Sequence, residues 1–221
     1  MITSERKQAF LKKAERVSAY REVRNLMAEA ADALNCRSVE RIRACLVQDE
    51  SMWIEFADEG RFNGPEAVDE LLAYLFSDAP GSAARLDLML TTPIVEIAGD
   101  GKTAQGVWWC PVPMTIRRED GKEQAVWAWG TIAADFLRCG AEWKIWHLHY
   151  FRVFKCRYAD GWVDDLSMIN RLNLPALPHS QPLSYHNPYS PLSVRDGIPA
   201  APRPYESYTD AMWMTETRKD R

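Results

Sequence analysis

The hydrophobic period of this chain changes once, after the loop at residues 77–82, and this change limits the possible folds more than any other feature. Before the loop, apolar residues recur at helical spacing and predict amphipathic helices over residues 4–34, 38–46 and 63–76. After the loop, they recur at about every second position, as in strands with one buried face. The first part therefore predicts three helices and the second part a β-sheet.

Turn signals divide the second part into strands. They are GDGK at 99–102, EDGK at 119–122 and RCGAE at 138–142. We expect antiparallel hairpins built from strands near 85–98, 102–118, 123–137 and 142–155, and one earlier strand at SMWIEFA, 51–57. Helices followed by a meander of long strands are typical of an α+β fold. We expect a cone-shaped barrel in which a strongly curved antiparallel sheet wraps around the three N-terminal helices.

Proline marks a second change of organisation near Asn170, since eight of the thirteen prolines follow it. Regular helix or sheet is not expected in this stretch. Leucine, isoleucine, tyrosine and tryptophan are interleaved with the prolines, whereas disordered tails contain few aromatic residues. We therefore expect a barrel domain at 1–169 and an extended C-terminal arm at 170–221, packed over its own barrel or over a neighbouring subunit.

Composition excludes several classes of protein. The 221 residues are 47% hydrophobic and 26% charged with a net charge of −4, so the basic face of a nucleic-acid-binding protein is not expected. The N-terminus is charged at helical spacing, and no apolar run approaches the roughly 20 residues of a membrane span. The five cysteines lack the spacing of a disulfide framework or a zinc site. We expect a cytoplasmic protein without a membrane or nucleic-acid partner.

Three segments resemble the SnoaL-like family of the nuclear-transport-factor-2-like superfamily: IEFADEGRFNGPEAV (54–68), TTPIVEIAGDGKTAQGVWW (91–109) and WGTIAADFLRCGAEWKIWHLHYF (129–151). The resemblance spans about residues 15–165 and implies a cone-shaped α+β barrel with an apolar pocket. Similar proteins include scytalone dehydratase, bile-acid 7α-dehydratase, ketosteroid isomerase, polyketide cyclases and the noncatalytic small subunit of ring-hydroxylating dioxygenases. Because one fold serves so many roles, the resemblance leaves the function open.

The chain departs from the dehydratases at their known site. Their first helix ends in a Tyr-Asp pair, and this chain has Leu34 and Asn35 at the corresponding positions. Their next site residue is a histidine, and the corresponding stretch LDLMLTTP at 86–93 contains none. The formaldehyde-releasing lyases that act on lignin-derived diaryl compounds are similar to this chain in joining the barrel to a long C-terminal segment.

A pair of histidines, His147 and His149, lies in the apolar stretch WKIWHLHYF at 143–151. Imidazole accepts and donates protons near neutral pH, so both are candidate catalytic residues, with an ordinary core histidine as the alternative. No third ligand accompanies the pair, and no metal is expected. Strand alternation places one set of residues on a single face, which we expect to line the barrel interior: Trp143, Ile145, His147, His149 and Phe151.

Two carboxylates interrupt apolar strands and are the other candidate catalytic residues. Glu55 lies in WIEFAD and Asp135 in TIAADFL. The alternative for each is an outward-facing strand residue. If either faces a pocket, desolvation raises its pKa and makes it a usable base.

Aromatic residues suggest the ligand. Indole rings offer flat apolar area and an N–H donor, which suits an aromatic or fused-ring compound. Candidate substrate-binding residues in the barrel are Tyr74, Trp108, Trp127 and Trp129. From the arm we expect Tyr185 and Arg195 near a pocket mouth, in a homo-oligomer that is a dimer or a trimer.

No phosphate loop, dinucleotide fingerprint or Ser/Cys nucleophile motif is present, so no cofactor is expected. The sequence favours a cofactor-independent lyase that dehydrates or cleaves a hydroxylated aromatic or polycyclic molecule, such as a lignin-derived diaryl compound. Cleavage here means a retro-aldol or deformylating reaction. Alternatives are a noncatalytic small-subunit or ligand-binding scaffold and a proton-transfer isomerase similar to ketosteroid isomerase.

Overall fold

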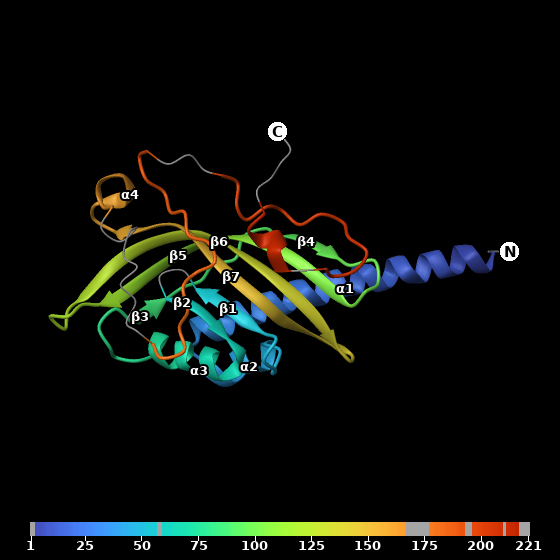
Figure 1. Cartoon of the computed structure of the whole chain (residues 1–221), viewed down its shortest axis with the longest axis horizontal. Helices are drawn as coiled ribbons and strands as arrows, with labels where there is room; N and C mark the ends of the chain where they lie inside the picture. Colours follow the sequence, from blue (N-terminus) through green and yellow to red (C-terminus); the bar gives the residue numbers. More distant parts are fainter. Residues whose placement is uncertain (1–2, 57–58, 167–176, 193–195, 210, 217–221) are drawn as a thin grey trace.

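The computed structural model describes residues 3–56, 59–166, 177–192, 196–209 and 211–216 (Figure 1). Three helices open the chain around a short hairpin, and five further strands follow. The helices are α1 (Ser4–Asn35), α2 (Val39–Cys45), α3 (Gly64–Leu75) and the short α4 (Gly161–Asp164), with a 3₁₀ turn at Ala211–Met214. The strands are β1 (Trp53–Phe56), β2 (Gly60–Asn63), β3 (Ala83–Leu86), β4 (Ile94–Ile97), β5 (Thr103–Arg117), β6 (Glu123–Cys139) and β7 (Glu142–Arg157).

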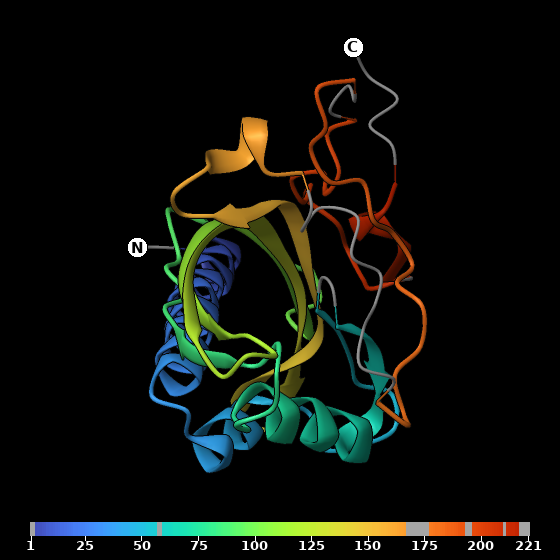
Figure 2. The ribbon, with the colours of Figure 1, turned by 90° about the vertical axis from the view of Figure 1, so that its left-hand side faces the viewer.

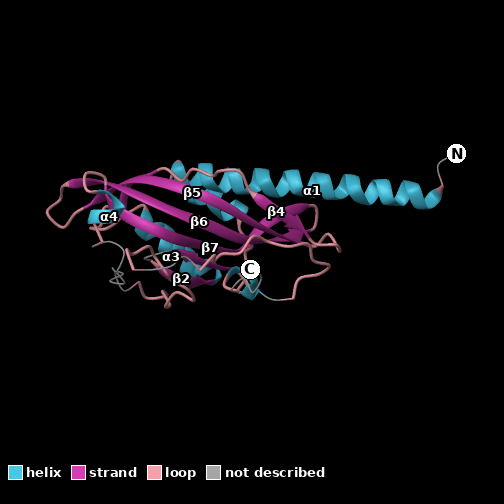
Figure 3. Cartoon of the chain, turned by 90° about the horizontal axis from the view of Figure 1, so that it is seen from above, coloured by secondary structure: helices cyan, strands magenta, loops and turns pink. Residues whose placement is uncertain are grey.

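The three N-terminal helices confirm the prediction from hydrophobic spacing. The hydroxyl of Thr3 accepts the backbone N–H of Arg6 and caps α1, and Pro65 occupies the first turn of α3, where its missing N–H costs nothing. Within α1, the buried residues recur every four positions, at Ala19, Val23, Met27 and Ala31. The second half of α1 therefore packs on the sheet, while its first half projects from the body (Figure 3).

One strongly curled sheet contains the strands in the order β2-β1-β7-β6-β5-β3, and β4 also pairs with β5. The α+β class and the cone-like curvature are confirmed (Figure 2). The sheet is mixed, however, because β1 runs parallel to β7. Consecutive strands joined by tight turns must be antiparallel, whereas β1 and β7 are far apart in the sequence and no hairpin sets their direction.

The predicted strand at 85–98 is wrong in detail, because the segment forms two short strands, β3 and β4. Between them, the backbone N–H groups of Asp87 and Met89 donate to the carbonyls of Pro113 and Pro111, at 3.1 and 3.2 Å. The two prolines have no N–H to return these bonds. Hydrogen bonds at this edge therefore run only from the 87–89 segment to β5 and not back, and regular strand structure is interrupted.

A bulge in β7 decides which way the histidines point. Ile145 pairs with Phe136 and His147 pairs with Asp135, so Trp146 between them has no counterpart on β6. The extra residue reverses the alternation of side chains. Ile145 packs in the core beneath the helices, whereas His147 stacks on Trp53 on the other side of the sheet. The prediction that Trp143, Ile145, His147, His149 and Phe151 share the interior face is therefore wrong.

Two hydrophobic cores lie on opposite sides of the sheet. The larger one joins α1, α2 and α3 to one side. The smaller one joins the other side to the C-terminal arm and contains Trp53, Val107, Ala133, Phe151, Ile198 and Met214. In Figure 2, α1 and the arm accordingly lie on opposite sides of β7. The described part of the arm packs on its own barrel, held by the apolar residues between its prolines.

We predict that Gly130→Ala destabilises the protein by about 1–3 kcal/mol. A Cβ at this position would lie 2.3 Å from Cε2 of Tyr150 and 2.5 Å from the backbone oxygen of Phe151. The backbone oxygen cannot move without disturbing the β6–β7 ladder. Denaturant unfolding measures the effect. The control Ala125→Ser, at an exposed position of β6, should stay within about 0.5 kcal/mol of wild type, and an equally small effect of Gly130→Ala would contradict the prediction.

Candidate active site

The register of the sheet brings all four predicted acid–base residues together beneath the arm. One cross-strand row contains Trp53, His147 and Asp135, and the next row contains Arg61, Glu55 and His149. Side chains opposite one another on neighbouring strands are within contact distance. Two acid–base pairs therefore lie side by side on this face of the sheet, His147 with Asp135 and His149 with Glu55.

Asp135 is fully buried and accepts hydrogen bonds on both carboxylate oxygens. Its Oδ2 lies 2.9 Å from Nδ1 of His147 and 3.3 Å from the hydroxyl of Tyr208, and its Oδ1 accepts Nε1–H of Trp213 at 2.7 Å. Burial raises the pKa of Asp135, and the hydrogen bonds from His147, Trp213 and Tyr208 oppose this rise. The carboxyl group thus holds a proton more readily than an exposed aspartate does.

His147 is held on both ring nitrogens and on both ring faces. Its Nε2 lies 3.1 Å from the backbone oxygen of Ser51, which can only accept, so Nε2 carries a proton. The ring stacks between Trp53 and Trp146, at centroid distances of 4.9 and 4.1 Å. Nδ1 faces Oδ2 of Asp135 at 2.9 Å, so a proton on either atom can form a hydrogen bond with the other. The hydroxyl of Tyr208 lies 3.3 Å from that same nitrogen.

Glu55 is also fully buried and connects the barrel to the arm. Its Oε2 accepts the backbone N–H and the hydroxyl of Ser184, at 2.8 and 3.0 Å, and its Oε1 pairs with Nη1 of Arg61 at 3.1 Å. The guanidinium of Arg61 also lies over the ring of Trp53, 4.4 Å from its centroid. A buried carboxylate with this many donors is well compensated.

His149, which lies beside Glu55 in the second pair, stays neutral. Its ring stacks on the ring of Phe151 at a centroid distance of 3.6 Å, and its Nδ1 is 3.5 Å from Oε2 of Glu55. Among the described residues, this nitrogen has no hydrogen-bond partner. Desolvation lowers the pKa of His149 to about 3, and the positive charge of Arg61 and the nearby His186 act in the same direction. The neutral ring can therefore donate one hydrogen bond and accept another near neutral pH, but it carries no charge.

Glu55, His147 and His149 line a cavity of about 390 Å³ between the sheet and the arm. Asp135 does not line it, but it contacts His147 and Tyr208, which do. The wall of the cavity combines aromatic and polar side chains from the barrel and the arm, among them Trp53, Trp146, Arg61, Ser184, Tyr208 and Met214. None of these six residues, nor Trp213, was predicted as a site residue, because residues with no motif around them cannot be assigned to a site from the sequence. The aromatic content of the arm was the signal that this segment packs somewhere.

The predicted substrate-binding residues of the barrel do not line this cavity. Trp108 is buried on the helix side of the sheet against Phe136. Tyr74 lies on α3, where burial, aided by Glu59, raises its pKa to about 12. Trp127 stacks on Tyr158, and Trp129 is exposed on the strand surface.

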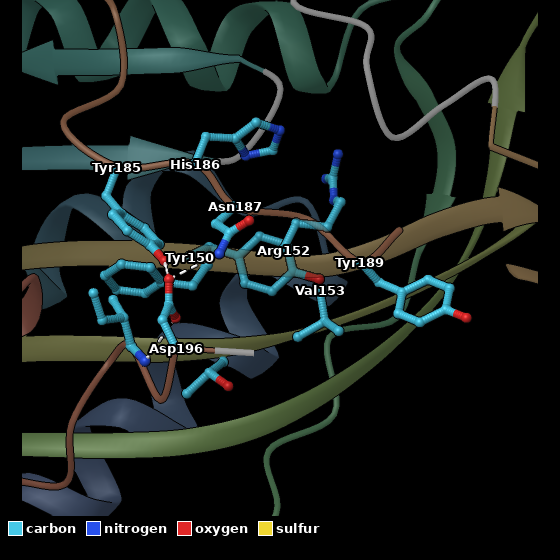
Figure 4. A pocket seen from close by; sticks show the side chains of 11 residues that line it. Tyr150, Arg152, Val153, Tyr185, His186, Asn187, Tyr189 and Asp196 are labelled. Carbon is cyan, nitrogen blue, oxygen red and sulfur yellow. Dashed lines mark hydrogen bonds between the residues drawn. The ribbon is translucent and has the colours of Figure 1, made fainter. Parts of the chain in front are cut away.

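The predicted arm residues are elsewhere as well. Tyr185 lines a second, smaller cavity of about 80 Å³, where it and Asn187 point toward Asp196 and donate hydrogen bonds to it (Figure 4). Its ring also touches Phe151 at a centroid distance of 5.9 Å. Arg195 lies outside the described residues. The roles predicted for these side chains in substrate binding stay predictions.

The described residues contain neither a metal-binding cluster nor a membrane-spanning helix. Across residues 3–216 with the gaps given above, His, Cys, Asp and Glu side chains form no group of three that could hold a metal ion. In the same ranges, no helix is both long enough and apolar enough to cross a membrane.

The cone of helices and curled sheet thus carries a buried His–Asp pair beside a cavity. Residues 15–149 match the model of the SnoaL-like domain, and the chain belongs to this family. A search of curated proteins finds no sequence that matches significantly.

Solved structures show the same fold at low sequence identity. A type 2 hexachlorocyclohexane dehydrochlorinase (LinA) matches with a TM-score of 0.58 and 12% identity, over 70% of this chain and 99% of its own. A proposed scytalone dehydratase from Novosphingobium aromaticivorans matches with a TM-score of 0.56 and 11% identity, over 70% and 97%. A type 3 dehydrochlorinase from Novosphingobium barchaimii matches with a TM-score of 0.56 and 14% identity, over 68% and 97%.

The family match ends at residue 149, before the arm begins. Ser184, Tyr208 and Trp213 therefore lie outside the part of the chain that the family model describes, although they contact the buried carboxylates of β1 and β6. The family model covers the barrel, and the arm contributes to the candidate site from outside the matched residues.

We predict that His149 makes the stability of the protein depend on pH. Its pKa falls from an ordinary value of 6.5 to about 3 in the folded chain. As the pH falls through this window, the unfolded state binds a proton that the folded state does not. The free energy of unfolding then decreases by up to about 1.4 kcal/mol per pH unit. In His149→Gln this contribution is absent, so unfolding free energies measured between about pH 7 and 4.5 should fall less steeply than in wild type.

The matched control is His179→Gln, since the side chain of His179 is half exposed. This variant should keep the slope of wild type. Parallel curves for wild type and His149→Gln would contradict the prediction.

Proposed function

We propose that this protein is a cofactor-independent lyase in which Asp135 and His147 form the acid–base group and Tyr208 connects them to the substrate. The observation that carries the proposal is the contact of 2.9 Å between Oδ2 of Asp135 and Nδ1 of His147, in a buried site beside a cavity. A carboxyl group hydrogen-bonded to an imidazole can pass a proton to or from a substrate. The phenolic hydroxyl of Tyr208 touches both members of the pair and lines the cavity.

Dehydration and retro-aldol cleavage both use these parts. In dehydration, a base removes the proton from the carbon beside the carbinol, an acid protonates the departing hydroxyl, and water and a double bond are formed. In retro-aldol cleavage, a base removes the hydroxyl proton, the carbon–carbon bond breaks to give an aldehyde, and an acid protonates the carbon that is released. Each reaction needs one acceptor and one donor in a site that excludes water.

The cavity suits a hydroxylated aromatic substrate. Its volume of about 390 Å³ falls within the usual range for small-molecule sites. The rings of Trp53 and Trp146 offer flat apolar surface, and Arg61 and Ser184 place hydrogen-bonding groups around it. A lignin-derived diaryl compound is one molecule of this class. His149, neutral beside Glu55, offers a further hydrogen bond to a substrate hydroxyl.

The arm supplies the water exclusion that the reaction needs. It covers the cavity with Tyr208 and Met214 and is fastened at Glu55 through Ser184 and at Asp135 through Trp213. Proline restricts the free chain, so ordering such a segment costs less entropy than ordering a flexible one.

The names of the structural neighbours fit this proposal, because a dehydrochlorinase and a dehydratase both carry out eliminations. A proton-transfer isomerase would use the same donor and acceptor, and the products of the reaction would identify it. A noncatalytic scaffold gains nothing from a buried acid–base pair next to a cavity, and we rank that alternative lower.

The test is turnover of a panel of aromatic secondary alcohols, β-hydroxy ketones and diaryl diols, with products identified by mass spectrometry. Loss of water, release of formaldehyde and isomerisation without change of mass separate the three reactions. We predict that Asp135→Asn and His147→Gln each lower kcat/KM by about 100-fold or more, the usual contribution of acid–base catalysis. Tyr208→Phe should lower kcat more than it raises KM.

The control is Tyr158→Phe, which removes the hydroxyl of an exposed tyrosine outside the cavity and should leave turnover unchanged. If the Asp135, His147 and Tyr208 variants all keep wild-type rates on a substrate that the wild type converts, the proposal is wrong. If the wild type converts no member of the panel but binds several, the scaffold alternative gains support.

A further inference from the structure

Two hydrogen bonds anchor the outer ends of the Asp135–His147 pair. At one end, the backbone oxygen of Ser51 lies 3.1 Å from Nε2 of His147, and a carbonyl oxygen can only accept a hydrogen bond. At the other end, Nε1–H of Trp213 donates to Oδ1 of Asp135 at 2.7 Å, and an indole nitrogen can only donate. Neither anchor can exchange a proton with the pair.

The inner atoms of the pair have partners of another kind. Oδ2 of Asp135 lies 2.9 Å from Nδ1 of His147 and 3.3 Å from the hydroxyl of Tyr208. A ring nitrogen of histidine and a hydroxyl can each donate or accept, so both suit Oδ2 with or without a proton on it. Among the described residues, Oδ1 has no hydrogen-bond partner besides the N–H of Trp213. A buried donor without an acceptor is costly, which favours a carboxyl proton on Oδ2.

Trp213 holds this position from outside the cavity wall. It belongs to the 3₁₀ turn Ala211–Met214 near the end of the arm, and its ring packs against the smaller hydrophobic core. The wall includes Tyr208 and Met214 but not Trp213. A molecule in the cavity therefore contacts the hydroxyl of Tyr208, which touches both Oδ2 and Nδ1, and does not contact the indole.

We propose that Trp213 is a positioning residue of the reaction: its N–H holds Oδ1 of Asp135, so that protons enter and leave this carboxyl group only at Oδ2, through His147 and Tyr208. This inference rests on the proposed function, since it concerns the same proton transfer. When Tyr208 gives its proton to a substrate oxygen, it takes a replacement from Oδ2 or Nδ1, and the reverse path returns one.

The bond from Trp213 also stabilises the charged form of the carboxylate. Burial raises the pKa of Asp135, and the hydrogen bonds from His147, Trp213 and Tyr208 lower it. Without the N–H of Trp213, the folded protein would therefore keep the carboxyl proton up to a higher pH. A residue that only packs against the core would have no such effect.

The other groups around the site leave this effect readable. The titratable and charged side chains of β1, β2, β7 and the arm at this site are Glu55, Arg61, His147, His149, Tyr205 and Tyr208. Of these, His147 and Tyr208 form hydrogen bonds with Asp135. Burial and the charge of Asp135 both raise the pKa of Tyr205, so its phenol stays neutral. The residue opposite Asp135 on β5 is Gln105, which does not titrate.

Replacing Trp213 by benzothienylalanine tests the inference. This amino acid keeps the bicyclic ring and carries sulfur in place of the N–H, so the packing is retained and the hydrogen bond is lost. The acidic limb of the profile of kcat/KM against pH should move upward by about one pH unit, because a hydrogen bond to a charged group is removed. At higher pH the rate should return to that of wild type, and KM should not change, since Trp213 does not touch the cavity.

The matched control is the same replacement at Trp162, an exposed tryptophan of α4 that stacks on Phe154 outside the cavity. It should keep the wild-type profile. If benzothienylalanine in place of Trp213 leaves the profile unmoved, or lowers the rate equally at every pH as a purely structural role would, the inference is wrong.

A titration that needs no turnover separates this inference from the proposed function. In protein labelled with carbon-13 at the aspartate carboxyl groups, the midpoint of Asp135 should lie at higher pH after the replacement of Trp213 and should not move after the replacement of Trp162. An unmoved midpoint refutes the role of Trp213 even in an active enzyme. A moved midpoint in a protein whose Asp135→Asn variant keeps full turnover would leave the hydrogen bond standing and refute the proposed function.

Discussion

The burial of the Asp135 carboxyl group is the constraint on which the rest of the site depends. A carboxylate removed from water costs several kcal/mol unless donors replace the lost hydration. Here the donors come from two places: His147 on the neighbouring strand, and Tyr208 and Trp213 on the arm. Detaching the arm would leave a buried charge undersatisfied, so the polar chemistry of the site and the docking of the arm stabilise each other.

The bulge at Trp146 makes Ile145 and His147 point to opposite sides of the sheet, although they are two positions apart in one strand. Without the extra residue, His147 would point with Ile145 into the core beneath the helices, where an imidazole would displace apolar packing. With it, the helix side stays apolar at this point, and the acid–base residues gather on the side that the arm covers. Bulges commonly redirect side chains next to functional sites, and this one does so by a single residue.

Membership of the SnoaL-like family explains the barrel and leaves the site to be argued separately. The match and the structural neighbours cover the barrel, while three of the groups that contact the buried carboxylates come from the arm. The arm lies outside the residues that the family model matches, and its side chains form part of the wall of the cavity.

The sequence by itself determined the three helices, the long hairpins and the residue types of the candidate site, because hydrophobic period, turn residues and charged interruptions of apolar strands are local signals. Only the tertiary structure decided that β1 lies parallel to β7, that His147 and Ile145 face opposite ways, and that Ser184, Tyr208 and Trp213 reach Glu55 and Asp135. These features depend on pairings between residues distant in the chain and on one unpaired residue in a ladder. Local periodicity cannot encode either, since moving the register by one position reverses every side chain without changing a single letter of the sequence.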